Sequence, residues 1–117
     1  MRARSLGARG PEISVIGFGA WEAGGGPEWG QAPPDDQIVA AMRTAMDAGI
    51  NWIDTAEVYG RGTSERLVGR AVEGRRDDVV IASKVAPADE GSGFRPEEVR
   101  AACDRSLGRL GTDRIDL

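Results

Sequence analysis

The 117-residue sequence predicts an α/β protein in which short strands and helices alternate around a parallel sheet. Two observations support this fold class. Four short apolar segments start roughly 30 to 35 residues apart, which is the spacing of a strand, a crossover helix and a return strand. The run VVIA at residues 79–82 is also apolar on consecutive residues, as expected for a parallel strand that is covered on both faces.

The strands of the predicted sheet follow a short hairpin. Residues 4–13, RSLGARGPEI, contain the glycine and proline residues that are typical of hairpin turns. The four sheet strands are then expected at residues 14–19, 50–54, 79–84 and 114–117. Helices should connect these strands in order.

The first helix is expected to follow residues 33–36, PPDD. Asp35 or Asp36 can cap its exposed amide groups, and Gly49 suits the left-handed turn that ends a helix. Its apolar positions have helical spacing: Ile38, Met42, Ala45 and Met46. This stripe should pack against the sheet.

The second and third helices have similar signals. The second should begin near residue 63 with Glu65 in its first turn, where a carboxylate faces the positive end of the helix dipole. Pro96 suits the first turn of the third helix, and Gly111 suits its end. The expected buried faces are Leu67, Val68, Ala71 and Val72 in the second helix, and Val99, Cys103, Leu107 and Leu110 in the third. On this pattern Cys103 is a core residue rather than a reactive thiol.

Four parallel strands with right-handed crossovers place all helices on one face of a curling sheet. The opposite face would then be apolar and open to water, with two unpaired edges. We therefore expect residues 1–117 to be the N-terminal portion of a single (β/α)8 TIM barrel domain: the hairpin, about three βα units and the start of a fourth strand. A half-barrel that pairs with a second copy is the alternative, and the oligomeric state stays open.

Composition limits the possible functions. With 40% hydrophobic and 29% charged residues, the chain is expected to be soluble and globular, and it contains no bilayer-spanning run. The basic start leads into no apolar signal segment, and Cys103 has no second cysteine to pair with, so we expect a cytoplasmic location. A net charge of −4 without a basic stripe argues against a nucleic-acid partner.

The side chains that remain for chemistry are few. The sequence has no histidine, so we expect no metal site and no histidine base, and Lys84 is its only lysine. Asp54 ends the second predicted strand, Lys84 ends the third, and Tyr59 follows Asp54 in the next loop. In a (β/α)8 barrel these positions lie on the catalytic rim. Taken singly, each residue also has an ordinary structural interpretation, as a turn cap, a solvated strand end or a packed loop residue.

The three side chains together suggest a proton donor. A carboxylate next to a lysine keeps the ammonium charged, and an ammonium next to a tyrosine favours the phenolate and makes the hydroxyl a stronger acid. Asp54 would thus hold Lys84, and Lys84 would activate Tyr59. Such a donor can protonate a carbonyl oxygen as hydride reaches its carbon, so the pattern indicates carbonyl reduction.

The stretch GINWIDTAEVYGRGTSERLVGRAV at residues 49–72, with VIGFGAW before it and VVIASKV after it, closely resembles the aldo-keto reductases. That resemblance implies a (β/α)8 barrel that reduces aldehydes or ketones to alcohols with NADPH, or with NADH. It also implies a catalytic tetrad of Asp, Tyr, Lys and His. Asp54, Tyr59 and Lys84 match its first three members, and the histidine is expected beyond Leu117.

The resemblance also implies binding residues. Gly19, Ala20 and Trp21 match a Gly-Thr-Trp run in the family, which lies against the nicotinamide and the substrate. With Asp54 they are the expected cofactor-binding residues, and Trp21 and Tyr59 are the expected contacts of a small carbonyl substrate. Alanine replaces the family's threonine at position 20, so a hydroxyl contact made there in relatives is missing.

Other interpretations stay open. The loop at residues 22–34, with Trp29, either shapes a substrate entrance or is an ordinary flexible loop. The protein is alternatively a cofactor-binding regulatory subunit of the same fold with little turnover. A third hypothesis makes Lys84 a Schiff-base lysine, as in barrel aldolases, but this leaves Tyr59 unexplained. The 117-residue chain alone is expected to be inactive and poorly soluble.

Overall fold

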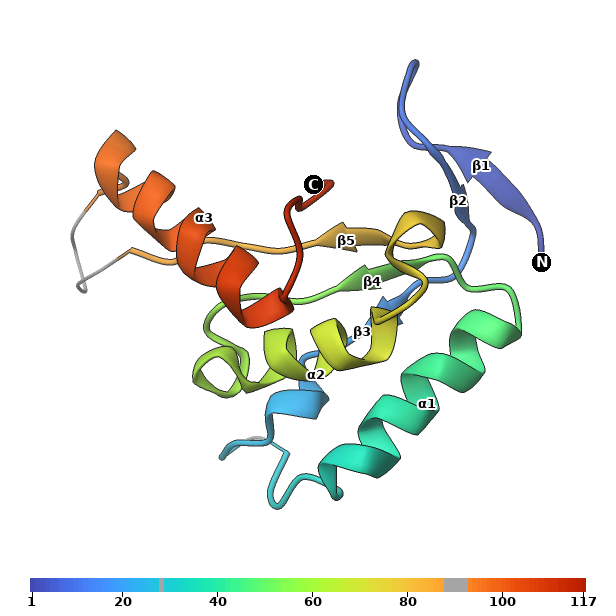
Figure 1. Cartoon of the computed structure of the whole chain (residues 1–117), viewed down its shortest axis with the longest axis horizontal. Helices are drawn as coiled ribbons and strands as arrows, with labels where there is room; N and C mark the ends of the chain where they lie inside the picture. Colours follow the sequence, from blue (N-terminus) through green and yellow to red (C-terminus); the bar gives the residue numbers. More distant parts are fainter. Residues whose placement is uncertain (28, 88–92) are drawn as a thin grey trace.

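The computed structural model describes residues 1–27, 29–87 and 93–117 (Figure 1). Its strands and helices are, in chain order, β1 (Ala3–Ser5), β2 (Glu12–Ser14), β3 (Phe18–Gly19), η1 (Glu22–Gly24), α1 (Asp35–Asp47), β4 (Trp52–Asp54), η2 (Tyr59–Gly62), α2 (Thr63–Val72), η3 (Arg76–Asp78), β5 (Val80–Ala82) and α3 (Pro96–Leu110). Strands and helices alternate from β3 onward, which confirms the predicted α/β class. No helix in the described parts of the chain is long and apolar enough to span a bilayer.

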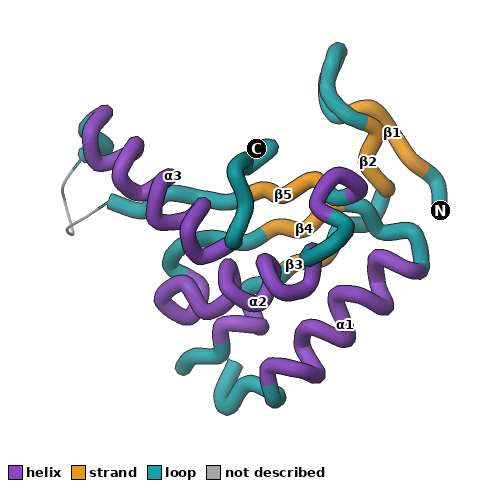
Figure 2. The backbone as a smooth tube through the Cα atoms, viewed as in Figure 1, coloured by secondary structure: helices purple, strands orange, loops and turns teal. Residues whose placement is uncertain are grey.

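The strands form two sheets. The predicted hairpin is present, with β1 and β2 paired antiparallel. The strands β3, β4 and β5 form a parallel sheet in that order and lie side by side in Figure 2. Gly19 pairs with Asp54, and Asp54 pairs with Ala82. This register brings the carboxyl ends of all three strands to the same edge of the sheet, which is where the predicted site residues follow.

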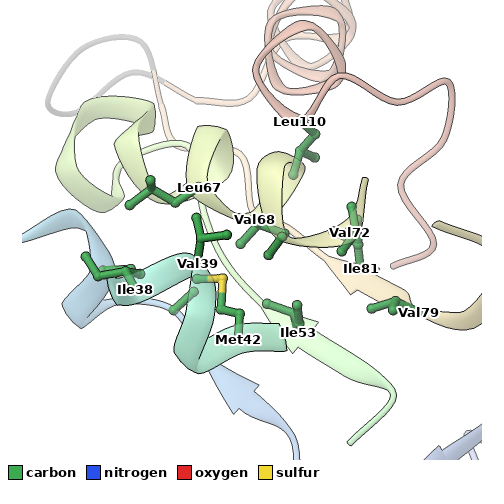
Figure 3. Packing of buried hydrophobic residues seen from close by; sticks show 13 residues of the cluster. Ile38, Val39, Met42, Ile53, Leu67, Val68, Val72, Val79, Ile81 and Leu110 are labelled. Carbon is green, nitrogen blue, oxygen red and sulfur yellow. The ribbon is translucent and has the colours of Figure 1, made fainter. Parts of the chain in front are cut away.

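The hydrophobic core lies between the parallel sheet and the helices that cover it (Figure 3). Ile53 and Ile81 contribute from the two longer strands, Met42 from α1 and Leu67 from α2, and all four are at most 2% exposed. Leu110 joins the cluster from α3. Burying large aliphatic side chains of this kind contributes about 1.5 to 3 kcal/mol each, so this single layer is the main source of stability.

The first predicted strand, at residues 14–19, is wrong as a continuous strand. The segment is divided between β2 and β3, because Ser14 Oγ donates a hydrogen bond to the carbonyl oxygen of Ile16 at 2.7 Å and bends the chain. Gly17 then passes directly beneath the indole of Trp52, where an added Cβ would come within 2.2 Å of the ring. Only glycine allows this close approach.

The segment at residues 114–117 does not form the predicted fourth strand, although its end lies along β5. Leu117 donates its amide to the Ile81 carbonyl at 3.2 Å and accepts the Ser83 amide at 3.0 Å. This alternation is the hydrogen-bond pattern of a parallel pair. The Asp116 carboxylate also accepts the Ile81 amide at 2.8 Å. Leu117 is therefore hydrogen-bonded to β5 as a residue of a neighbouring parallel strand would be, and the segment runs in the predicted direction.

The start of α1 differs from the prediction. Pro34 precedes the helix and no side chain caps it, so the predicted capping by Asp35 or Asp36 is wrong. Both aspartates lie in the first turn, where they complement the helix dipole, and both form ion pairs with Arg70 of α2. Gly49 follows the end of the helix with a φ of +97°, as predicted.

The buried face of α3 is rotated from the predicted one. Ala102, Ser106 and Leu110 are buried, whereas Val99 and Cys103 are exposed. Two of the four predicted core positions are therefore wrong, because this helix contacts the rest of the chain along one narrow stripe. Val99 and Cys103 instead line an open groove of about 270 Å³ between α3 and the chain that follows β5.

Candidate active site

The structure brings the three sequence-predicted site residues together at the carboxyl edge of the parallel sheet. Asp54 ends β4, Lys84 follows β5, and Tyr59 begins η2. Lys84 Nζ lies 2.7 Å from Asp54 Oδ1 and 3.3 Å from the hydroxyl oxygen of Tyr59. It also donates to the carbonyl oxygen of Thr55 at 3.0 Å. One ammonium group thus connects a carboxylate, a phenol and a backbone carbonyl.

The charge of Lys84 is favoured in this arrangement. Partial burial alone would lower the pKa of Lys84, but its hydrogen bonds to Asp54 and Tyr59, with the nearby carboxylate charge, raise the pKa above its usual value. A Schiff-base lysine needs a neutral amine as its nucleophile, so this environment argues against the Schiff-base interpretation. Because the folded-state pKa is raised, the ammonium stabilises the fold fully below the usual pKa of lysine. This contribution is lost as the pH rises through the folded-state value.

Replacing Asp54 by Asn should move the titration of Lys84 to lower pH, because the amide removes the negative charge but keeps the shape. In the whole protein, isotope-labelled lysine gives a Lys84 Cε signal, assigned by its loss in Lys84→Arg, whose chemical shift follows the ammonium as the pH is raised. Asp47→Asn is the matched control, since Asp47 pairs with Arg75 at 2.9 Å in another part of the structure. An unchanged midpoint in Asp54→Asn would show that the carboxylate does not hold the ammonium.

Aromatic side chains extend from the tyrosine. The Trp21 ring stacks on the Tyr59 ring at a centroid distance of 5.9 Å and an interplanar angle of 24°. Trp29 meets Trp21 edge to face at 5.4 Å. Trp21 and Trp29 are 48% and 45% exposed, so they form an exposed apolar surface that extends from the Tyr59 ring. Glu28, in the same loop at residues 22–34, lies outside the described residues.

The backbone of η1 holds the tyrosine loop in place, a feature that sequence reasoning missed. Gly24 and Gly60 touch directly: a Cβ added at Gly24 would lie 2.4 Å from the Gly60 nitrogen, and one at Gly60 would lie 2.4 Å from the Gly24 oxygen. Gly60 and Arg61 both have left-handed backbone angles, with φ of 57° and 53°. The tight turn after Tyr59 therefore depends on two glycines in contact.

Replacing Gly24 by Ala should destabilise the fold and loosen the Tyr59 loop, because the new methyl group meets backbone rather than a movable side chain. Gly108→Ala is the matched control: nothing lies within 4 Å of its added Cβ, and it sits inside α3. Alanine in a helix interior is favoured over glycine by about 0.5 to 1 kcal/mol. Thermal unfolding should therefore shift down for Gly24→Ala and up for Gly108→Ala. A melting temperature that shifts in the same direction for both variants would show that the contact between Gly24 and Gly60 does not limit the size of the side chain at position 24.

The residues at the end of β3 differ in exposure. Gly19 is exposed, and nothing lies within 4 Å of a Cβ built on it, so the surface above it is open. Ala20 is fully buried; its amide donates to the Asp54 carbonyl at 2.8 Å, and its carbonyl accepts the Ser64 hydroxyl at 2.6 Å. Gly19 therefore faces the site together with the exposed Trp21, whereas Ala20 lies beneath it and supports the end of β4.

Sequence reasoning placed Glu65 in the first turn of α2 but missed its buried ion pair. Its side chain is fully buried, accepts the Ser83 hydroxyl at 2.7 Å and pairs with Arg109 Nε at 2.5 Å. The available signal was its helical spacing with Val68 and Val72, which places a carboxylate on the apolar stripe. A buried carboxylate requires a partner, and α3 provides it.

Residues 15–117 match the model of the aldo/keto reductase family, and the chain belongs to that family. It is 40% identical to the aldo-keto reductase YhdN of Bacillus subtilis over 123 residues, covering 100% of this chain and 37% of that protein. It is 38% identical to the L-galactose dehydrogenase of Arabidopsis thaliana over 117 residues, covering 97% of this chain and 36% of that protein.

A solved structure of similar fold is the aldo-keto reductase of Klebsiella pneumoniae in complex with NADPH. The TM-score is 0.79 at 37% identity, and the match covers 99% of this chain and 38% of that one. The chain therefore spans less than two fifths of the length of these relatives.

Proposed function

We propose that the whole protein is an NADPH-dependent oxidoreductase that reduces aldehydes or ketones to alcohols, with Tyr59 as the proton donor. The observation that carries this proposal is the position of the Lys84 ammonium, 2.7 Å from the Asp54 carboxylate and 3.3 Å from the Tyr59 hydroxyl. An ammonium beside a phenol stabilises the phenolate that forms when the proton leaves. NADH is the alternative cofactor, and a histidine at the end of the fourth strand is the fourth catalytic residue we expect.

We also propose that residues 1–117 form the N-terminal portion of a single (β/α)8 TIM barrel. Under this proposal β3, β4 and β5 are its first three strands, and residues 114–117 lead into the fourth. The alternation of parallel strands and helices supports it, as does the match to less than half of each related structure, from 34% to 44%. Exposed large apolar side chains such as Val15 and Ile16, at 43% and 59%, are also consistent with a layer that further chain would cover.

The residues at the carboxyl edge of the sheet suit a nicotinamide ring. The open surface over Gly19 gives room for a flat ring, and Asp54 lies beside it in register. The exposed Trp21 adds an apolar wall on the same rim. Gly19, Trp21 and Asp54 would hold this end of the cofactor, and Ala20 would act only through the backbone beneath them. When bound, NADPH supplies the hydride for the reaction.

The side chains of this chain supply the proton. The substrate carbonyl oxygen would accept a hydrogen bond from the Tyr59 hydroxyl, and its proton would pass to that oxygen as negative charge develops there. Lys84 would stabilise the phenolate that remains, and Asp54 would keep the ammonium charged and directed at the phenol. The aromatic surface of Trp21 would orient the substrate and exclude water from one side.

The test is to incubate the whole protein with NADPH and a panel of aldehydes and ketones. We expect NADPH consumption matched by an equal amount of alcohol, with at least one carbonyl substrate turned over many times per protein molecule. Tight NADPH binding without turnover of any carbonyl would instead favour the regulatory-subunit alternative. Activity with NADH alone would correct the cofactor while leaving the reaction class in place.

A further inference from the structure

The chain on both sides of Lys84 is held by the side chains of two glutamates, one in α2 and one in the loop after β4. On one side, the hydroxyl of Ser83 donates to the buried carboxylate of Glu65 at 2.7 Å. On the other side, the amide of Ala86 donates to the carboxylate of Glu57 at 2.8 Å. The amide of Glu57 also donates to the carbonyl oxygen of Lys84 itself at 3.3 Å. These contacts hold residues 83–86 along the loop that follows β4.

One arginine connects the two carboxylates. Arg109 Nε lies 2.5 Å from Glu65 Oε2, and its Nη2 lies 3.6 Å from Glu57 Oε2. The side chains of Glu65 and Glu57 are 0% and 12% exposed, so water screens these charges little. Gly62 makes room for the arginine, because a Cβ there would come within 2.4 Å of Arg109 Cδ. Arg109 thus neutralises Glu65 and shares Glu57 with Arg105 of α3, whose Nη2 also lies 3.6 Å from Glu57 Oε2. Only a glycine at position 62 leaves room for Arg109.

The same contacts set where the lysine side chain begins. Lys84 must reach the Asp54 carboxylate and the Tyr59 hydroxyl at once, and its side chain is half exposed, so side-chain packing alone does not fix it. We propose that Glu57 is a positioning residue, which with Arg109 fixes the backbone around Lys84 and thereby the direction of its ammonium group. This inference rests on the proposed function for the claim that this ammonium serves a proton donor.

A merely structural role for Glu57 predicts a different result from a positioning role. If the glutamate only stabilised the fold, its removal would lower the melting temperature while folded molecules kept their turnover. If it positions Lys84, folded molecules lose kcat while cofactor affinity stays the same, because Glu57 lies away from the open surface over Gly19. Misplacing a reacting group by about 1 Å can lower a rate about 100-fold, so the effect is measurable.

The experiment compares Glu57→Ala and Glu57→Gln in the whole protein. Glu57→Ala should lower kcat about 10- to 100-fold with little change in the Kd of NADPH. It should also move the Lys84 Cε titration to lower pH, with that signal assigned by its loss in Lys84→Arg. The glutamine keeps an oxygen that can accept the Ala86 amide, so Glu57→Gln should keep more of the activity. Glu73→Ala, at the exposed end of α2, should match the wild type in both readouts.

The inference is wrong if folded Glu57→Ala keeps the wild-type kcat and Lys84 titration, or if Glu57→Gln is as impaired as Glu57→Ala. If Glu57→Ala does not fold, the double variant Arg105→Met, Arg109→Lys decides, because it removes one partner of Glu57 and replaces the other by an ammonium that cannot span both carboxylates as the guanidinium does. It should show the same loss of kcat and the same titration shift, and wild-type values would overturn the inference.

Tyr59→Phe, measured alongside, tests the proposed function separately. If that variant stays active, the proton-donor proposal fails. The Lys84 titration in Glu57→Ala still tests whether Glu57 positions the lysine.

Discussion

Replacing Tyr59 by Phe in the whole protein should lower kcat for carbonyl reduction by about 100- to 10,000-fold, the usual contribution of a positioned acid. The phenyl ring can still stack on Trp21, as the phenol does at 5.9 Å, so the fold and the aromatic surface should be preserved. The change removes only the hydroxyl that faces the ammonium of Lys84.

Two measurements check this expectation together. The rate of NADPH consumption gives kcat, and quenching of tryptophan fluorescence gives the Kd of NADPH, which should change little. Circular dichroism of the variant should overlay that of the wild type. A variant that binds NADPH and keeps its turnover would contradict the assignment of the proton donor. A variant that loses NADPH binding would show instead that the tyrosine holds the cofactor.

The second large effect concerns stability. Replacing Arg109 by Met should lower the free energy of unfolding by about 3 to 5 kcal/mol, because it leaves the buried Glu65 carboxylate without its ion partner. Arg75→Met is the matched control, since its pair with Asp47 is exposed and such pairs contribute about 1 kcal/mol or less. Urea unfolding of the two variants and the wild type measures the difference.

A second replacement shows whether charge is the cause. Adding Glu65→Gln to Arg109→Met removes the unpaired charge while keeping an acceptor for the Ser83 hydroxyl, so the double variant should recover part of the lost stability. Equal small losses for Arg109→Met and Arg75→Met would contradict the buried ion pair. A double variant less stable than Arg109→Met alone would assign the loss to packing rather than to charge.

The features that the sequence predicted well depend on local patterns. Consecutive apolar residues predicted the buried strand β5, and an apolar stripe at helical spacing predicted the helix α2 that packs on the sheet. Both elements are present. Asp54 and Lys84 stand at the ends of adjacent parallel strands, so the alignment of those ends was enough to predict that they meet. Lys84 follows β5 by two residues, within the reach of a lysine side chain.

The features that were missed depend on contacts between distant residues. Cys103 has the spacing of a core position, but which face of α3 is buried depends on what the helix packs against, and the helix leaves that cysteine exposed. The bend after Ser14 is followed by a close contact of Gly17 with Trp52, 35 residues further along the chain, which the local sequence does not predict. Glu65 and Arg109 are likewise 44 residues apart, so neither sequence neighbourhood predicts the other.

The most direct test of the whole account is the transfer of deuterium from NADPH deuterated on its nicotinamide ring to a carbonyl substrate, measured by mass spectrometry of the alcohol. With the whole wild-type protein, we expect the deuterium on the carbinol carbon of the product. With Tyr59→Phe and bound NADPH, little labelled alcohol should form in the same time. An undiminished yield of labelled alcohol from Tyr59→Phe would show that the proton does not come from the residue that Lys84 and Asp54 hold at this site.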